Sequence, residues 1–344
     1  MQSLPNGATT PSTTEGQSAL ELVLSLQHAF EQKLPSIQDE LQTFSWLRDE
    51  GKHGGGLRRA TSLGPHYDRA SINVSSVHYD DDPARSLQSA TALSTIIHPK
   101  NPLAPSLHCH ISLTHMKDGR FYWRLMADLN PSNPVKEHEV RFRAAVRPCC
   151  AHLVDYAEAQ GDRYFFIPAL NRHRGVAHYY LEAYHTDDFE KDLEFALRFG
   201  EAVIDVYSGI LEDSIHLKYS EADLAKQLEY HTTYFFQVLT LDRGTTSGVL
   251  VHDQNDVGIM ASLPSHVDKE LLKSWAEHMP PIQKPLLKGL IQALPNLHPA
   301  PVDDRTRAEL AKVVRAHYTA HPEALKFQAS GDVTPPTVQN HKPK

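Results

Sequence analysis

Three side chains that can transfer protons or bind metal, His108, His110 and Asp128, are spaced so that they could meet on one surface. His108 and His110 are two residues apart, which puts both imidazoles on the same face of a β-strand. Imidazole titrates near neutral pH and therefore suits general acid–base chemistry. Two histidines and one carboxylate can also form the facial triad that holds non-haem iron. The spacing indicates a candidate metal site of His108, His110 and Asp128.

A β-hairpin is expected to position these residues. Residues 107–116 alternate apolar and polar side chains, and residues 120–129 form a second strand-like run. Residues 117–119 fit a type I turn followed by a left-handed glycine. A two-residue loop would instead place Asp128 on the apolar face, where a carboxylate is costly. The predicted register therefore pairs His108 with Asp128, His110 with Met126, and Ser112 with Arg124. The plainer interpretation is one solvated face of an antiparallel sheet.

This stretch resembles the oxygen-dependent coproporphyrinogen III oxidase family. The resemblance rests on the run Ile97-His98-Pro99-Lys100-Asn101-Pro102, followed by His108, and covers about residues 20–280. Further segments match in the same order: Gly54-Gly55-Gly56 with Arg59, residues 68–75, Ser89-Ala90-Thr91, Asp128-Leu129 with Pro131, Tyr164-Phe165-Phe166, His173-Arg174-Gly175, Asp242-Arg243-Gly244-Thr245 and Ser262-Leu263-Pro264.

Departures from the family pattern indicate a divergent member. Where the family has three glycines, residues 124–126 read Arg-Leu-Met, so bulky side chains stand where the family leaves room beside a flat macrocycle. The asparagine and arginine of a His-x-Asn-x-Arg run are His110 and Ser112 here, and a late family arginine is Asn255. Because Arg124 lies opposite Ser112 in the predicted register, we expect it to replace the missing arginine.

The resemblance implies an enzyme that uses dioxygen as electron acceptor. Such enzymes convert two propionates of coproporphyrinogen III to vinyl groups and yield protoporphyrinogen IX for porphyrin and haem biosynthesis, without a cofactor. The implied catalytic residues are His108, which would relay a proton, Asp128, which would contact the pyrrole N–H groups, and Arg174. The implied fold is a large antiparallel sheet flanked by helices on both faces, in a homodimer. The candidate residues for binding the acidic tetrapyrrole are Arg59, Ser94, Arg124, Arg243, Gly244, His110 and His178.

Two other classes of function fit the same residues. A metal-dependent oxygenase would use non-haem iron at His108, His110 and Asp128. The missing family arginines and filled glycine positions would also fit a non-catalytic tetrapyrrole-binding protein, or the same oxygen chemistry on a smaller acid.

Composition describes an ordinary globular chain of 344 residues, with 40% hydrophobic and 22% charged residues. The net charge of −8 argues against nucleic acid as a partner. The three cysteines form no disulfide framework and no Cys-x-x-Cys pair, so we expect a cytoplasmic protein without an iron–sulfur cluster. The sequence contains neither a secretory signal nor an apolar run long enough for a membrane span.

Mixed strands and helices without β-α alternation predict an α+β fold. We expect one domain over residues 17–325, between disordered tails over residues 1–16 and 326–344. The expected strands cover residues 70–79, 89–98, 107–116, 120–129, 176–184, 232–242, 247–252 and 257–263. The expected helices cover residues 18–34, 36–48, 136–159, 187–212, 221–229, 266–278, 281–293 and 303–319. We expect residues 51–56 to form a glycine-rich loop.

Overall fold

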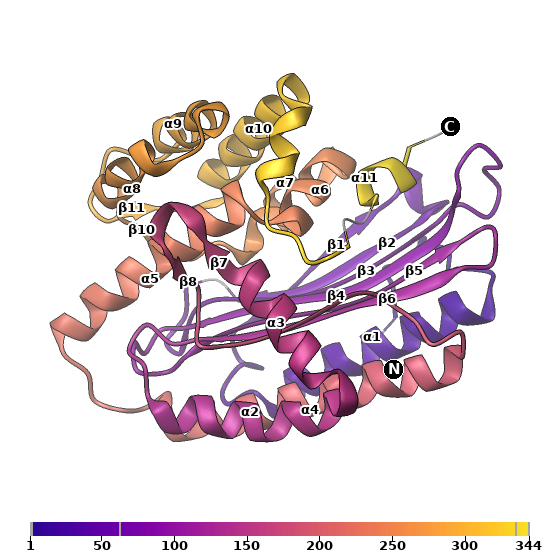
Figure 1. Ribbon diagram of the computed structural model, residues 1–344, viewed down its shortest axis with the longest axis horizontal. Coiled ribbons are helices and arrows are strands. Elements are labelled where there is room, and N and C mark those ends of the chain that lie inside the picture. Colours follow the sequence, from indigo (N-terminus) through magenta and orange to yellow (C-terminus); the bar gives the residue numbers. More distant parts are fainter. Residues whose placement is uncertain (1–2, 62, 334–335, 343–344) are drawn as a thin grey trace.

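The chain forms an α+β fold built on a seven-stranded antiparallel sheet, as expected (Figure 1). The structure is a computed structural model that describes residues 3–61, 63–333 and 336–342. The sheet has the strand order β1-β2-β3-β4-β5-β6-β9. The strands of the large sheet are β1 (Leu41–Leu47), β2 (Gly54–Thr61), β3 (Tyr67–His78), β4 (Leu87–Pro99), β5 (Ser106–Met116), β6 (Phe121–Asn130) and β9 (Ala177–Tyr184). Two short strand pairs are β7 (Phe166–Ile167) with β8 (Arg172–His173), and β10 (His266–Val267) with β11 (Ala300–Pro301).

Helices cover both faces of this sheet (Figure 1). The helices are α1 (Thr14–Lys33), α2 (Lys136–Cys150), α3 (Val154–Phe165), α4 (Phe189–Ser214), α5 (Glu221–Thr240), α6 (Arg243–Val251), α7 (Asp256–Ile259), α8 (Lys269–Trp275), α9 (Lys284–Ala293), α10 (Asp304–Ala320) and α11 (Thr337–Asn340). On one face, apolar side chains such as Cys109 and Ile111 form a core with α1 and α4. A second core joins α5, α8, α9 and α10 on the other side.

The hairpin of β5 and β6 has the predicted register. Met116 N–H donates to the Arg120 carbonyl at 2.8 Å, and Gly119 adopts φ +88° in the turn. His108 lies opposite Asp128, and Ser112 lies opposite Arg124. The turn residues and the strict alternation of residues 107–116 are local signals. Both favour this register, so it could be predicted without knowledge of tertiary contacts.

Two predictions at the start of the sheet are wrong. The expected helix over residues 36–48 is largely the edge strand β1, and the expected loop over residues 51–56 contributes the first residues of β2. Glycine permits this pairing because a Cβ on Gly56 would lie 2.3 Å from the Trp46 indole nitrogen. The glycines therefore allow a close backbone approach, rather than a flexible linker.

The strands expected over residues 232–242, 247–252 and 257–263 are also wrong, because these segments belong to α5, α6 and the α7 region. Every residue from 231 to 240 is buried, so α5 shows no amphipathic period in its second half. A short apolar run rich in aromatic and β-branched residues fits a strand equally well by pattern alone. The capping box of Ser220 and Asp223 starts this helix.

Both segments expected to be disordered tails make contacts in the structure. The Thr9 hydroxyl donates to the Gly51 carbonyl at 2.9 Å, and α1 begins at Thr14 rather than Ser18. Near the other end, the Asn340 side chain donates to the Tyr122 hydroxyl at 3.2 Å. Residues 1–2, 334–335 and 343–344 of these predicted tails lie outside the described residues.

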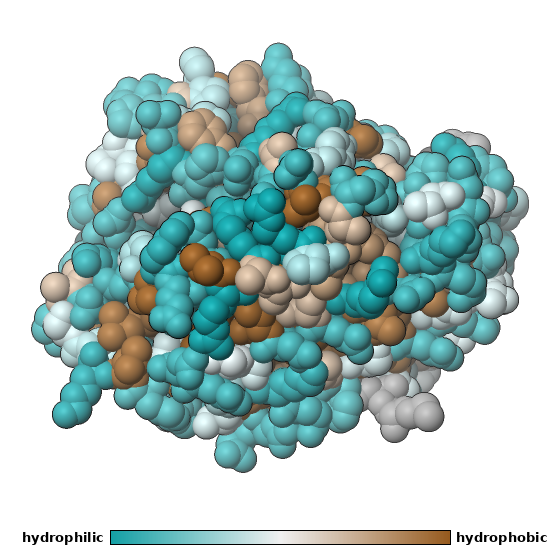
Figure 2. All heavy atoms as spheres, turned by 60° about the horizontal axis from the view of Figure 1, so that its bottom comes forward, coloured by the Kyte–Doolittle hydropathy of each residue, from teal (hydrophilic) through white to brown (hydrophobic). Residues whose placement is uncertain are grey.

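The surface seen in Figure 2 is mostly hydrophilic, and its hydrophobic side chains form separate groups. Scattered apolar side chains are normal on protein surfaces. Among the residues that the structure describes, no helix is long and apolar enough to cross a membrane.

Candidate functional site

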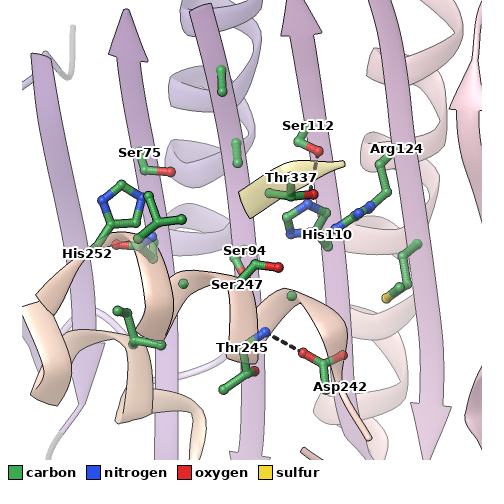
Figure 3. Close-up of a pocket in the computed structure, with 18 of the residues that line it drawn as sticks. Ser75, Ser94, His110, Ser112, Arg124, Asp242, Thr245, Ser247, His252 and Thr337 are labelled. Carbon is green, nitrogen blue, oxygen red and sulfur yellow. Dashed lines mark hydrogen bonds between the residues drawn. The ribbon is translucent and has the colours of Figure 1, made fainter. Parts of the chain in front are cut away.

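A cavity of about 270 Å³ lies between the sheet face of β3–β6 and the α6–α7 region, and α11 closes one side (Figure 3). Hydroxyl groups are frequent in its wall. Those labelled in Figure 3 come from three parts of the chain: the sheet supplies Ser75, Ser94 and Ser112, α6 supplies Thr245 and Ser247, and α11 supplies Thr337. The predicted polar face of the hairpin therefore forms one wall of this cavity.

At the base of the wall, one carboxylate joins two of the predicted catalytic residues. His108 Nδ1 lies 2.8 Å from Asp128 Oδ1, and Arg174 donates to Asp128 Oδ2 at 2.7 Å. The Asn130 amide donates to the same Oδ2 at 2.6 Å. Hydrogen bonding from Nδ1 to the carboxylate leaves Nε2 of His108 as the nitrogen that can accept a proton. His108 and Arg174 both line the cavity.

Asp128 lies behind this wall and is 0% exposed. Burial alone would raise the pKa of the Asp128 carboxyl, but the positive charge of Arg174 and the bond from His108 hold this pKa below its usual value. The carboxylate is therefore ionised at neutral pH. Asp128 does not line the cavity, and its predicted contact with pyrrole N–H groups stays a prediction. Its carboxylate contacts both His108 and Arg174.

Arg174 is held by aromatic rings and hydrogen bonds, and its Nε is buried without a partner among the described residues. Its guanidinium lies 4.6 Å from the Phe165 ring centre and 4.9 Å from that of Tyr234, and it donates to Gln237 Oε1 at 2.5 Å. Its carbonyl accepts a hydrogen bond from Nε2 of His178 at 2.6 Å. His178 was predicted to bind substrate, but it is buried and does not line the cavity. Its position makes it a support for Arg174.

Arg124 lies opposite Ser112 on the cavity face, as predicted (Figure 3). Its Nε and Nη2 both lie 2.9 Å from Glu182 Oε1. Burial raises the pKa of the Glu182 carboxyl, although the charge of Arg124 opposes this shift. The geometry leaves open the predicted replacement of a family arginine by Arg124. It also shows that Glu182 neutralises most of the charge of Arg124.

Two further predicted residues line the same wall. His110 Nε2 lies 3.0 Å from the Ser112 hydroxyl, and Ser94 is the cross-strand neighbour of His110. Burial, followed by the nearby charge of Arg124, holds the pKa of His110 well below its usual value. His110 is therefore neutral at physiological pH and can donate or accept one hydrogen bond on the cavity side.

The segment 242–245 begins α6 at the cavity. Asp242 caps the helix by accepting from Thr245 N–H at 2.7 Å, and its other oxygen accepts from the Tyr164 hydroxyl at 2.8 Å. Gly244 lines the cavity, as predicted, whereas Arg243 does not. The Arg243 Nε is buried and has no hydrogen-bond partner among the described residues.

Arg59 lies away from the cavity. Its Nε donates to Glu31 of α1 at 2.9 Å on the opposite face of the sheet, so it does not fit the predicted role in binding substrate. Its neighbour Arg58 faces the cavity side, where Asn73 is its cross-strand partner. Arg59 was selected from the family resemblance, and the sequence did not assign residues 57–61 to a strand whose two faces would separate the two arginines.

The alternative metal triad is not assembled. Within the described ranges, no group of three or more histidine, cysteine, aspartate or glutamate residues is arranged to hold a metal ion. Both oxygens of Asp128 already accept hydrogen bonds from protein groups. His110 lies opposite Met126 rather than beside that carboxylate.

Several residues of the site were missed by sequence reasoning. Nothing in the sequence paired Glu182 with Arg124. Gln237 was missed because it lies in a segment that was expected to be a strand. Asn340 and His341 of the C-terminal segment line the cavity, and no local sequence signal indicated this.

Comparison with known proteins identifies the family of this chain. The family described as coproporphyrinogen III oxidase matches residues 18–280. Oxygen-dependent coproporphyrinogen-III oxidases from Rickettsia bellii (strain OSU 85-389) and Rickettsia africae (strain ESF-5) are each 27% identical to this chain over 237 residues. These matches cover 65% of this chain and 83% of each relative. The chain belongs to the coproporphyrinogen III oxidase family.

Proposed function

We propose that this chain catalyses the oxygen-dependent conversion of two propionate side chains of coproporphyrinogen III to vinyl groups, which yields protoporphyrinogen IX. The proposal rests on the His108–Asp128–Arg174 cluster, in which a buried carboxylate orients an imidazole and a guanidinium toward one cavity. Family membership and the names of the relatives support the same reaction.

Each propionate would consume one dioxygen and one proton and release carbon dioxide and hydrogen peroxide. His108 Nε2 would accept the pyrrole N–H proton, because Nδ1 is held by Asp128. The electron-rich ring would then pass two electrons and the β-hydrogen to dioxygen. Cleavage of the bond to the carboxylate would release carbon dioxide and supply the electron pair of the new vinyl double bond. His108 would then return its proton to the pyrrole nitrogen, and the consumed proton would convert hydroperoxide to hydrogen peroxide. The porphyrinogen supplies the reducing power, so the proposal includes no cofactor and no metal.

Arg174 would stabilise negative charge that develops during proton transfer and decarboxylation. Its guanidinium is 2% exposed and locked between two aromatic rings, so it would need no rearrangement during the reaction. We extend the proposal to a cytoplasmic homodimer, which the family resemblance and the cysteine content support.

A specific observation favours a second candidate substrate. The two arginines that line the cavity, Arg124 and Arg174, are each paired with a carboxylate of the protein, and Met126 also occupies the wall. Such a wall offers little free positive charge for an acid with several carboxylates. The second candidate is therefore the same oxidative decarboxylation on a smaller or less acidic pyrrole.

The test is aerobic turnover of coproporphyrinogen III by purified protein, with and without a chelator, followed as protoporphyrin fluorescence after oxidation. We expect product that survives chelation and falls at least about 100-fold in His108→Gln, in line with the loss of a general base. The matched control is His185→Gln, which alters an exposed histidine away from the cavity. Equal activity of His108→Gln and the wild type would exclude the proposed role, and the absence of product would favour the second candidate.

A further inference from the structure

Three buried arginines have few ion-pair partners, and none of these arginines is among the residues that line the cavity. Arg58, Arg69 and Arg307 are 7%, 9% and 7% exposed, and the Nε of each lacks a hydrogen-bond partner. Arg58 and Arg69 form no ion pair or hydrogen bond with any residue that the structure describes. Arg307 pairs only with Asp304, whose side chain is largely exposed. Unpaired buried charge is strongly destabilising, so this arrangement needs an explanation.

Two of these arginines extend the polar face that lines the cavity. Arg58 of β2 is the cross-strand neighbour of Asn73, and Arg69 of β3 precedes Ser71 by two residues on the same face. Both Asn73 and Ser71 line the cavity. The guanidinium of Arg58 also packs against Gly258, where an added Cβ would lie 2.2 Å from Nη1.

Arg307 approaches from α10, in the second turn from the N-terminal cap at Asp303. Burial, followed by the charge of Arg69 and of Arg58, lowers the pKa of Arg307 to about 10, despite the opposing charge of Asp304. The amino end of a helix already carries partial positive charge, which makes it a poor place for an additional cation. Packing contacts bring the segments of these arginines together. The helix α7, whose Gly258 lies against Arg58, packs on α10. Ser265 N–H donates to Asp68, the neighbour of Arg69, and the Ser265 carbonyl accepts from Val302 N–H just before α10.

We propose that Arg58, Arg69 and Arg307 form a binding site for a small oxyanion, a carboxylate or a phosphate group. Guanidinium groups bind both kinds of oxyanion through paired N–H donors, and the free Nε atoms provide such donors. One anion would neutralise the cluster and join β2, β3 and α10. Arg307 lies outside the matched family region of residues 18–280, so the complete site needs a segment beyond it.

The oxyanion has two sources with this chemistry. One is a carboxylate arm of the substrate, which could extend past Asn73 because the arginines within the cavity wall are already paired. The other is free inorganic phosphate. Binding of a substrate carboxylate rests on the proposed function, whereas binding of free phosphate does not. The experiment can therefore refute either one without refuting the other.

The experiment measures the thermal unfolding midpoint in increasing inorganic phosphate, with chloride used to hold the ionic strength constant. The variants are Arg307→Met and Arg69→Gln. The matched control is Arg305→Met, which removes an exposed arginine from the first turn of the same helix. We expect phosphate to raise the Tm of the wild type and of Arg305→Met by about 2 °C or more, with no rise in the two cluster variants.

Two results would overturn the site: a wild-type Tm that does not respond to phosphate, or an equal response in Arg307→Met and Arg305→Met. Without phosphate, Arg307→Met should unfold at or above the wild-type temperature, because it removes a repelling charge. A lower Tm for Arg307→Met under these conditions would contradict the repulsion on which the proposal depends.

Turnover then distinguishes the two sources. If the substrate carboxylate occupies the site, Arg307→Met should raise KM about 10-fold or more while kcat changes little, and phosphate should compete with substrate. If free phosphate occupies the site, KM should stay unchanged while the Tm response to phosphate is lost. Either pattern supports an oxyanion site. The KM comparison needs turnover and therefore rests on the proposed function, whereas the Tm response to phosphate does not.

Discussion

At the scale of single residues, the site depends on one buried carboxylate that accepts hydrogen bonds from His108, Arg174 and Asn130. Asp128 accepts from His108 and from Arg174, and burial makes each of these bonds stronger than it would be in water. The same burial makes the arrangement intolerant of partial loss, because a charge left alone in the interior lacks solvation.

Asp128→Asn should therefore lower the free energy of unfolding by about 3–5 kcal/mol, since Arg174 would remain buried without its counter-charge. The double variant Asp128→Asn/Arg174→Met should recover much of this stability without recovering activity. Urea unfolding of both single variants and the double variant measures the coupling. If the losses of unfolding free energy in the two single variants add up to the loss in the double variant, the two side chains do not act as a pair.

The pair of Arg124 and Glu182 leads to a second prediction at this scale. Glu182→Gln removes the carboxylate that neutralises Arg124 while keeping its hydrogen-bonding shape. If Arg124 can contact an acidic substrate, KM should fall about 10-fold, which corresponds to about 1.4 kcal/mol. Steady-state kinetics of Glu182→Gln and Arg124→Gln provides the measurement. The same KM for both variants would show that Arg124 does not contact a substrate carboxylate.

At the scale of elements, α6 closes the cavity because its first turn is held in place. Asp242 caps the helix and also accepts a hydrogen bond from Tyr164 of α3. The cap therefore joins a helix start to a neighbouring helix, so its loss should disturb the cavity wall as well as the helix.

Asp242→Ala should lower stability by about 1–2 kcal/mol, the usual value of an N-cap, and should raise KM as the α6 wall loosens. Asp242→Asn should lose less, because an asparagine oxygen can still accept from Thr245 N–H. Tyr164→Phe removes only the hydrogen bond from the Tyr164 hydroxyl to Asp242 and leaves the cap at Thr245 N–H. Comparing it with Asp242→Ala therefore shows how much each contact contributes. Thermal unfolding and KM are the two measurements, and a fully stable Asp242→Ala protein would contradict this role for the cap.

The elements also show why the sequence predicted some parts of the fold and not others. The hairpin was predictable because turn residues and alternation within residues 107–129 agree with the tertiary structure. The second half of α5 was not, because burial on all sides removes its helical period. Glu182 reaches Arg124 through the pairing of β6 with β9, a contact that no local pattern contains.

At the scale of the whole molecule, two half-buried histidines join the C-terminal segment to the cavity wall. The ring centres of His252 and His341 lie 5.7 Å apart. The ring of Tyr79, the residue directly after β3, contacts the ring of His341. Burial lowers the pKa of His252 to about 4 and that of His341 to about 3, and the charges of Arg48 and Arg85 add to the shift of His341. Both rings are therefore neutral in the folded protein at pH 7.

The sign of the pH dependence follows from these depressed pKa values. Between about pH 6.5 and pH 4 the unfolded chain binds protons at these histidines that the folded chain does not, so stability falls as pH falls through this window. Each histidine should contribute about 1–2 kcal/mol of this loss between pH 7.5 and pH 5.

Urea unfolding at pH 7.5 and pH 5 tests this effect in the wild type and in His341→Gln. The variant should lose less stability on acidification, because one proton-binding group has been removed. His185→Gln serves as the control, since its histidine is exposed. An acid sensitivity of His341→Gln identical to that of the wild type would contradict the account.

The most direct measurement of the proposed function is the ratio of dioxygen consumed to vinyl groups formed. Purified protein with coproporphyrinogen III and a chelator would be followed with an oxygen electrode, and the porphyrin product would be quantified at the same time points. The proposed reaction predicts one dioxygen for each vinyl group, in the presence of chelator, and no product without dioxygen. A lack of dioxygen uptake, or uptake that the chelator abolishes, would contradict a metal-free oxidative decarboxylation at His108.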